Sequence, residues 1–425
     1  MVKDIRIEDF DYALLDERIA RHPLQKRDEC KLLLVRPDGK TGHFRFKNLP
    51  DLLPVGSLLV CNDTKVINAR IEFRKETGAR IEIFLLEPYS PSDYAEIFRT
   101  SQKCIWKCLV GNLKKWKEGP LRLSLNLPGS PFPVILTASK CDMAESEDND
   151  TLVEFSWDNP DISFAEILEF AGKIPIPPYL NRDSEESDNT DYQTVYARFR
   201  GSVAAPTAGL HFTDALFADL AAHNIDTAKI TLHVGAGTFK PVKSANIGQH
   251  DMHTESFGIS RDTLGRLVSQ LESGLPIVAV GTTTVRTLES LPLLGSKLAE
   301  GDTSLHVTQW EAYTRHTRTL PALKAILDYM DCNNLETLHA STSIIIAPGF
   351  PWKMTDVMVT NFHQPRSTLL LLVSSFLGGD STWRRVYDEA LAKDYRFLSY
   401  GDACLFFRPC DFNYTAPIPN LNCEL

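Results

Sequence analysis

The sequence lacks any apolar stretch of about 18 residues, the length that a membrane-spanning helix requires. Its longest apolar candidate, Ser367 to Leu377, is too short for a span, and we predict a buried helix there. No apolar signal region opens the chain at residues 1–6. These absences predict a cytoplasmic protein that neither spans nor binds a membrane.

Paired cysteines and several common catalytic motifs are also missing. The nine cysteines include no Cys-x-x-Cys pair, and the spacing of Cys104 and Cys108 fits neither a zinc knuckle nor a redox motif. We therefore expect reduced, mostly buried thiols. There is no His-Glu-x-x-His motif, no Gly-x-Ser-x-Gly nucleophile elbow and no complete dinucleotide or P-loop fingerprint.

The net charge of −10 argues against a protein that coats nucleic acid indiscriminately. A local excess of basic residues occurs at 65–122, with twelve Lys and Arg against seven Asp and Glu. Trp106 and Trp116 lie among these lysines and could stack RNA bases. At strand spacing the same two rings could equally pack the core of a barrel beneath solvated lysines. The sequence leaves both interpretations open.

Length and patterning predict an α/β fold with two domains. The 425 residues, 43% of them apolar, are enough for more than one core. Short β-like segments without a convincing helix between them occur at 79–87, 105–110, 121–127, 132–137 and 151–157. We predict a small inserted β-barrel domain at 67–158. It interrupts a larger α/β domain, a sheet with flanking helices, made of 1–66 plus 159–425.

In the larger domain, strands and helices alternate. The pattern predicts helices at 162–171, 214–223, 261–273 and 284–291, and strands at 227–234 and 276–280. Ser163 followed by Glu166 has the capping-box spacing, which indicates a helix start.

Four segments carry small and polar residues where a plain core would have apolar ones: Ser202–His211, His233–Phe239, Gly281–Arg286 and Thr360–Thr368. Ligands of open α/β sheets bind at the carboxyl ends of strands, so four such turns in one domain predict a shared pocket. The hydroxyl run after Gly281 opens a helix, where anionic or polar groups are favoured. Any one of these turns alone could be an ordinary helix cap.

The histidines allow two chemical interpretations. His250, His253 and Glu255 have metal-ligand spacing, but they fall in a turn and not on a defined helix. An imidazole that titrates near neutral pH can donate, accept or transfer protons without a metal, and we favour that interpretation and predict no metal site. A purely structural histidine stays open at each position.

Taken in order, these segments resemble the signature blocks of a known enzyme family. The blocks lie at 19–23, 62–67, 176–179, 192–196, 203–213, 231–239, 252–255, 280–286, 359–363 and 395–402. As a set they are similar to the S-adenosylmethionine:tRNA ribosyltransferase-isomerases of queuosine biosynthesis. The resemblance extends to about residue 407.

The resemblance implies an α/β domain with an inserted β-barrel and a reaction in which S-adenosylmethionine donates its ribosyl group. The group would be transferred to 7-aminomethyl-7-deazaguanine at the wobble position of a tRNA and isomerised, giving epoxyqueuosine with release of adenine and methionine. A base would remove a proton from the ribose carbon beside the sulfonium, and adenine would leave with a proton or a hydrogen bond. S-adenosylmethionine as co-substrate, tRNA as partner and no metal are thus expected.

On this resemblance, the catalytic candidates are His211, His233, His363, Glu255 and Asp402. Arg286 would hold the methionine carboxylate or a tRNA phosphate. The expected substrate-binding residues are Thr207, Gly209, Gly235, Gly237, Thr238, Gly281, Thr282, Thr283, Arg286 and Asn361.

The chain also departs from the family pattern. Residues 296–340 stand where typical members have a short connection, and Asn68 stands where the family usually has proline. Substrate specificity is therefore left open. Three other functions are considered: a non-catalytic tRNA-binding paralogue, a metal-assisted nucleotide hydrolase and an ordinary methyltransferase. We expect a monomer, because the sequence shows no exposed coiled-coil pattern.

Overall fold

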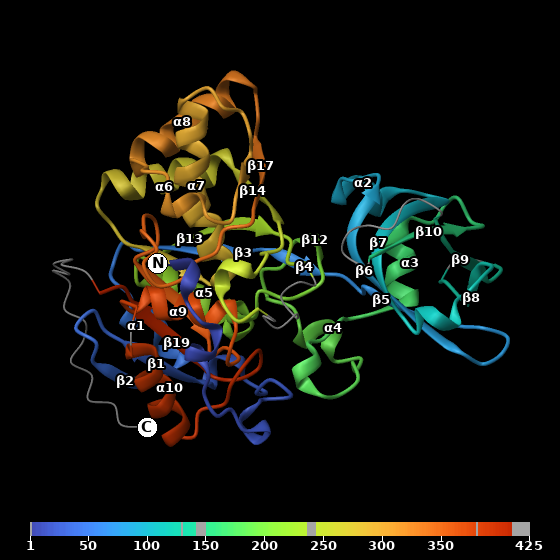
Figure 1. Cartoon of the computed structure of the whole chain (residues 1–425), viewed down its shortest axis with the longest axis horizontal. Helices are drawn as coiled ribbons and strands as arrows, with labels where there is room; N and C mark the ends of the chain where they lie inside the picture. The colour runs from blue at the N-terminus through green and yellow to red at the C-terminus, as the bar shows by residue number, and fades with distance from the viewer. Residues whose placement is uncertain (1, 129–130, 142–149, 236–243, 380, 410–425) are drawn as a thin grey trace.

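The computed structural model describes residues 2–128, 131–141, 150–235, 244–379 and 381–409. It is a mixed α/β structure with a ten-stranded sheet, a seven-stranded sheet and a two-stranded ribbon (Figure 1). The predicted α/β class is confirmed. Among the described residues, no helix is both long and apolar enough to cross a membrane.

The ten-stranded sheet is mixed, with a parallel centre. In spatial order its strands are β16 (His306–Val307), β17 (Thr337–Thr342), β14 (Glu255–Ser260), β13 (Asp226–Leu232), β3 (Leu58–Asn62), β15 (Ile277–Val280), β18 (Val357–Asn361), β19 (Ala403–Phe407), β1 (Lys31–Val35) and β2 (Thr41–Arg45). The central strands β13, β3, β15 and β18 pair in parallel. Their carboxyl ends therefore meet at one edge of the sheet.

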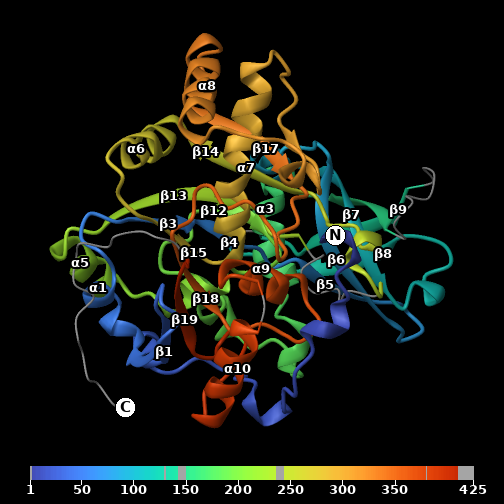
Figure 2. The ribbon, with the colours of Figure 1, turned by 60° about the vertical axis from the view of Figure 1, so that its left-hand side comes forward.

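Strands β3, β15 and β18 are buried along their whole length because both faces of the sheet are covered there. In β3, Leu58 and Val60 pack into one hydrophobic cluster, and Leu59 and Cys61 pack into another. The helices that accompany the sheet are α1 (Leu49–Leu52), α5 (Asp214–Ala222), α6 (Arg261–Glu272), α7 (Thr282–Ala299), α8 (Thr319–Cys332), α9 (Thr368–Phe376) and α10 (Thr382–Ala392). Helices α6, α7 and α8 lie together at one end of the molecule in both views (Figures 1 and 2).

Several local predictions are confirmed. The apolar run at 367–377 is the buried helix α9, with the Ser367 side chain accepting a hydrogen bond from the Leu370 amide. Ser163 and Glu166 form the expected capping box of α3 (Phe164–Ala171). The unusual segment 296–340 is part of the main body, because α8 packs on α7 and α6 and the segment supplies the edge strand β16.

The seven-stranded sheet is antiparallel throughout and has its own hydrophobic cluster. Its strands, in spatial order, are β11 (Gly172–Lys173), β5 (Arg70–Arg74), β6 (Arg80–Ser90), β7 (Lys103–Gly111), β10 (Thr151–Trp157), β9 (Val134–Lys140) and β8 (Leu121–Leu125). Trp106 and Trp116 are 0% and 1% exposed in this cluster, so they pack the core and cannot stack RNA bases.

The expectation that no helix interrupts these strands is wrong. Helix α2 (Tyr94–Arg99) follows β6, and the Asp93 side chain caps it by accepting a hydrogen bond from the Glu96 amide. A six-residue helix is too short to produce a recognisable helical period in the sequence. The parallel ribbon of β4 (Thr64–Val66) and β12 (Phe199–Ser202) lies between the two large sheets (Figure 1).

Candidate functional site

A cavity of about 190 Å³ lies at the carboxyl edge of the parallel strands. Residues 281–283, directly after β15, and residues 360–368, at the end of β18, form two of its walls. Residues 204–208 and 344–346 form two more. Three of the four predicted segments therefore meet at one site, and the fourth, 233–239, contributes Val234, while its residues 236–239 lie outside the described part of the chain. Of the predicted site residues, the cavity lining includes Thr207, Glu255, Gly281, Thr282, Thr283, Arg286, Asn361 and His363.

The other predicted site residues have different positions. His211, His233, Gly209, Gly235 and Asp402 do not belong to the lining. Gly237 and Thr238 lie outside the described residues.

A buried ion pair forms part of the cavity wall. The Arg286 guanidinium donates from Nη1 to the Glu255 carboxylate and from Nε to the Ile344 carbonyl oxygen at 3.2 Å. Both side chains are less than 10% exposed. Burial raises the pKa of Glu255, while the neighbouring Arg286 and His253 oppose that rise. The second terminal nitrogen of Arg286, Nη2, is buried and has no hydrogen-bond partner among the described residues.

Gly281 sets the approach of α7 to the cavity. It joins β15 to α7 with a φ of +86°, in the region that favours glycine, and its amide donates to the Val359 carbonyl oxygen at 2.8 Å. The turn brings Thr282 and Thr283 into the lining at the N-terminus of an 18-residue helix. Unpaired amides and hydroxyls at such a terminus suit polar or anionic ligand groups.

His363 is the predicted catalytic histidine that lines the cavity. Its Nε2 is 2.9 Å from the Thr360 Oγ1, its backbone amide donates to the Tyr387 hydroxyl, and the Tyr12 hydroxyl donates to its carbonyl oxygen. Burial lowers its pKa to about 4. The ring is therefore neutral at pH 7 and able to accept a proton or a hydrogen bond.

His211 lies behind the cavity and contacts a lining residue. Its Nε2 is 3.0 Å from the Asn361 amide nitrogen, and its Nδ1 is 3.4 Å from the Cys30 Sγ. The Asn361 oxygen in turn accepts from the Thr207 hydroxyl at 3.0 Å. Burial lowers the pKa of His211 to about 3. The neutral ring thus fixes the orientation of the Asn361 amide, which holds Thr207 at the cavity.

His233 faces the seven-stranded sheet, which lies in the chain between β4 and β12 and is called the inserted sheet below. Its Nδ1 is 2.9 Å from the Thr64 Oγ1, and its ring packs on Tyr94 of α2 with the centroids 4.4 Å apart. Burial lowers its pKa to about 4. Gly235, two residues on, uses its backbone amide to hydrogen-bond Glu255.

Asp402 and Gly209 have positions that the packing explains. The Asp402 carboxylate accepts from the Lys31 and Arg396 backbone amides, each at 2.8 Å, so it joins β1 to the turn before β19. A Cβ on Gly209 would lie 2.0 Å from the Tyr196 hydroxyl oxygen, which leaves no room for a side chain there.

The sequence of the chain matches the family model described as "Queuosine biosynthesis protein" over residues 7–406. The chain belongs to this family. A relative from Anaeromyxobacter sp. (strain Fw109-5), named S-adenosylmethionine:tRNA ribosyltransferase-isomerase, is 35% identical, covering 95% of this chain and 99% of its own. A relative of the same name from Pelobacter propionicus is 37% identical, covering 93% and 98%. The crystal structure of an S-adenosylmethionine tRNA ribosyltransferase from Thermotoga maritima is 28% identical with a TM-score of 0.45, covering 94% of this chain and all of that one.

The queuosine-family blocks at 176–179 and 192–196 also reach the cavity, although no role was predicted for their residues. Tyr179 and Tyr192 line it together with Ser399, and the Tyr179 hydroxyl is 2.5 Å from the Ser399 Oγ. Their membership in ordered blocks was the signal that could have identified them.

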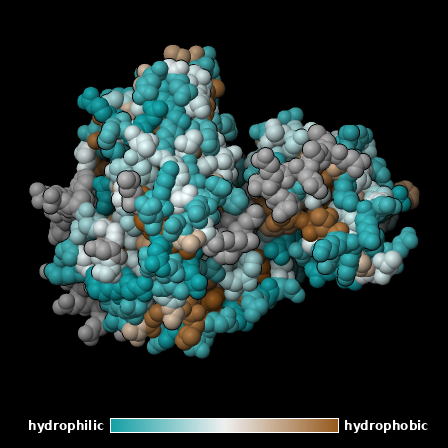
Figure 3. All heavy atoms as spheres, in the orientation of Figure 1, coloured by the Kyte–Doolittle hydropathy of each residue, from teal (hydrophilic) through white to brown (hydrophobic). Residues whose placement is uncertain are grey.

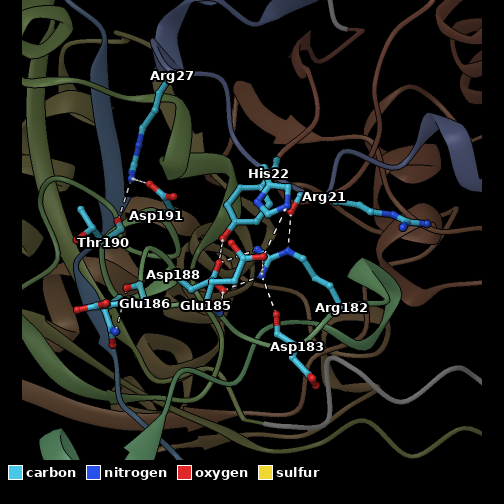
Figure 4. Close-up of polar contacts among 12 residues, drawn as sticks. Arg21, His22, Arg27, Arg182, Asp183, Glu185, Glu186, Asp188, Thr190 and Asp191 are labelled. Atoms are coloured by element: carbon cyan, nitrogen blue, oxygen red, sulfur yellow. Dashed lines mark hydrogen bonds and ion pairs between the residues drawn. The ribbon is translucent and has the colours of Figure 1, made fainter.

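A clamp of charged residues fixes the connector that carries these two tyrosines (Figure 4). Arg182 donates to both carboxylate oxygens of Asp188 at 2.8 and 2.7 Å, and Asp188 is fully buried. The Tyr400 hydroxyl donates to the same carboxylate at 3.2 Å. Arg27 donates to the Thr190 and Gln193 carbonyl oxygens. The connector is thereby fixed against the turn that carries Ser399.

The suspected metal-ligand histidines are also at the cavity. His250 and His253 are in its lining beside Glu255. Among the described residues, no group of three or more His, Cys, Asp and Glu side chains is arranged to hold a metal ion.

Proposed function

We propose that the chain transfers the ribosyl group of S-adenosylmethionine to 7-aminomethyl-7-deazaguanine at the wobble position of a tRNA and isomerises it, releasing adenine and methionine. Family membership and the activity named for relatives that align over almost their entire length support this proposal. We assign the enzyme to the cytoplasm because the proposed substrate is a tRNA.

The observation that carries the proposal is the unpartnered Nη2 of Arg286 beside the cavity. A buried guanidinium nitrogen without an acceptor is costly, so a ligand that supplies an acceptor binds favourably. The carboxylate of the methionine moiety is such an acceptor and can pair with a guanidinium. Because Arg286 uses Nη1 for Glu255 and Nε for the Ile344 carbonyl oxygen, Nη2 stays available for the substrate.

Other lining residues suit the ribosyl and adenine groups. Thr282 and Thr283 bring hydroxyls into the lining at the start of α7, and Asn361 and Thr207 are a hydrogen-bonded polar pair in the same lining. His363, neutral at pH 7, is the side chain we assign to proton transfer at the ribose carbon beside the sulfonium. His211 is a positioning residue that acts through Asn361, and Glu255 is the partner of Arg286.

We further propose that residues 67–158 form an inserted domain that closes into a small β-barrel. Two observations support this. Most of one hydrophobic cluster comes from this segment, with Phe164, Ile167 and Leu168 of α3 and Val203 packed into it, and β5 and β8, near opposite ends of the seven-stranded sheet, contact one another. The rest of the chain, 1–66 plus 159–425, is the catalytic domain in this proposal.

Product analysis tests the reaction. The protein is incubated with ribose-labelled S-adenosylmethionine and tRNA that carries the deazaguanine precursor, and the released small molecules and the modified nucleoside are identified by mass spectrometry. Adenine, methionine and a labelled epoxyqueuosine in equal amounts are expected. S-adenosylhomocysteine would indicate a methyltransferase, chelator-sensitive nucleotide cleavage a metal-assisted hydrolase, and tRNA binding without adenine release a non-catalytic paralogue. Each of these outcomes would overturn the proposal.

A further inference from the structure

Two aromatic rings meet where the inserted sheet adjoins the rest of the molecule. Tyr94, at the start of α2, and His233, directly after β13, lie 4.4 Å apart between ring centroids, inclined by 37°, and each is partly exposed. Gly201 of β12 lies against both rings. A Cβ there would be 2.6 Å from the His233 ring and 2.8 Å from Tyr94, so only glycine allows this approach.

Phe199 of β12 lies on the same face of the ribbon as these rings. It pairs in register with Thr64, and register partners in a sheet carry their side chains on the same face. The Thr64 Oγ1 contacts the His233 Nδ1 at 2.9 Å, so Phe199 is on the face where His233 lies. Phe199 is 46% exposed, although burial is favoured for a ring of its size. We call Tyr94, Phe199 and His233 the aromatic platform. Figure 3 shows hydrophobic surface on the side of the seven-stranded sheet that faces the rest of the molecule.

A cation accompanies the exposed ring. The Arg198 guanidinium lies 5.0 Å from the centroid of Phe199, and its side chain makes no ion pair within the described part of the chain. Burial raises the pKa of Asp63, and the charge of Arg198 is among the influences that oppose this rise. The Asp63 carboxylate is nevertheless buried, and it accepts a hydrogen bond from Thr231 at 2.6 Å. In a chain with a net charge of −10, an exposed arginine beside an exposed ring suits a ligand with both a flat apolar face and a negative charge.

The aromatic platform adjoins the cavity. Val234, the residue after His233, and Ala204, three residues after Gly201, both belong to the cavity lining. Tyr94 is also close enough to the cavity wall for its charge to act on the phenol. Burial raises the pKa of Tyr94, and the carboxylates of Glu87 and Glu255 add to that rise. At about 3.3 Å per strand residue, Phe199 lies roughly 7 Å along the ribbon from Gly201. A polymer with one unit in the cavity can therefore place a neighbouring unit on Phe199.

We propose that the aromatic platform stacks an unpaired nucleobase of the tRNA loop, next to the base modified in the cavity, while Arg198 contacts a phosphate of the same strand. This inference rests on the proposed function, because it takes the RNA from there. Single-stranded RNA is the fitting partner, since splayed bases stack on aromatic side chains and arginine pairs with phosphate.

The test compares RNA affinity with catalysis. Phe199→Ala, Phe199→Tyr and Arg198→Gln are assayed with a fluorescein-labelled anticodon stem–loop RNA that carries the deazaguanine precursor. The control is Phe132→Ala, because Phe132 is 77% exposed in the bend before β9, away from the ribbon. Fluorescence anisotropy gives the RNA Kd, and adenine release gives kcat and the KM for S-adenosylmethionine. All four variants alter exposed side chains, so thermal unfolding should match the wild type.

Phe199→Ala is expected to raise the RNA Kd about 5- to 150-fold, the range measured for loss of one base–aromatic stack. Phe199→Tyr keeps an aromatic ring and should therefore bind the RNA as the wild type does. Arg198→Gln should make the plot of log K against log salt shallower by about 0.7, as for one lost phosphate contact. The kcat and the KM for S-adenosylmethionine should stay unchanged.

If the wild-type protein releases adenine and Phe199→Ala binds the RNA with the same Kd as the wild type, the platform alone is overturned. A wild-type protein that neither binds the RNA nor releases adenine overturns the proposed function, and the platform with it. An equal loss of affinity in Phe132→Ala would also overturn the platform, since the effect would not be specific to this face.

Discussion

Arg286→Met should affect both the stability of the fold and the affinity for S-adenosylmethionine, and a double variant separates the two effects. The substitution removes the partner of Glu255 and leaves a carboxylate that is 5% exposed without its countercharge. Removing one member of a buried pair typically costs about 3–5 kcal/mol of unfolding free energy. The double variant Arg286→Met, Glu255→Gln is neutral at both positions, so it should recover most of that loss.

The pH dependence of the single variant follows from the same carboxylate. Burial already raises the pKa of Glu255 above its usual range, and loss of Arg286 raises it further. A carboxyl whose folded pKa is raised stabilises the fold below its unfolded pKa, and that stability is lost as pH rises through the folded pKa. Urea unfolding should therefore show a larger deficit for Arg286→Met at pH 8 than at pH 5. The double variant should lack this dependence.

Ligand binding should respond differently from stability. A hydrogen bond to a charged group contributes about 1.5–3 kcal/mol, which corresponds to a 10- to 150-fold rise in the Kd for S-adenosylmethionine. Calorimetric titration should show this rise in both the single and the double variant, because each lacks Nη2. Lys324→Met, which breaks a half-exposed pair with Glu272, is the control and should match the wild type. Wild-type affinity in the double variant would refute the ligand role, and equal stability of the two variants would refute the argument from the buried pair.

Three further changes test the surroundings of the cavity. Asn361→Ala should remove the hydrogen bonds that link His211 to Thr207. The KM for S-adenosylmethionine should rise about 10-fold in steady-state assays, and the unfolding free energy should fall by about 1–3 kcal/mol. An unchanged KM would contradict the link. Glu289→Gln, which alters a buried carboxylate that accepts from the amides of 353–355, should lower the unfolding free energy in urea by about 1.5–3 kcal/mol. His363 has a folded pKa of about 4, below its unfolded value, so it contributes stability above pH 6.5 that is lost toward pH 4, at up to about 1.4 kcal/mol per pH unit. His363→Gln should reduce that loss between pH 6.5 and 5; the same loss in both proteins would contradict the assignment.

Local chemistry made much of the fold predictable. The apolar run at 276–280 indicated the buried strand β15, the Ser163 cap located the start of α3, and the apolar run at 367–377 indicated α9. The spatial order of the strands was not predictable, because β3 lies between β13 and β15 through pairings over more than 150 residues. Helix α2 was missed because its single burial face spans fewer than two turns.

The site was predictable as a set of turns, but the roles of its side chains were not. Polar residues after apolar strands indicated the cavity walls at Gly281 and Thr360. His211 and Asp402 have the residue types and block positions of catalytic groups, yet their hydrogen bonds go to Asn361 and to backbone amides. Which polar group faces a cavity depends on burial and on distant partners, and neither is encoded in local spacing.

The inserted sheet changes how the chemistry of the cavity is best understood. Parallel strands alone bring the turns after β15 and β18 to one edge, and they would form a pocket for a small molecule without any insertion. The insertion adds Tyr94, whose ring meets His233 at that edge. A residue 139 positions earlier in the chain thus contacts the residue that follows β13, and Val234, next to it, lines the cavity. An enzyme that must hold a small donor and a nucleotide of a large RNA at the same time needs such an edge, where the donor pocket is set in one body and the second body supplies surface beside its opening.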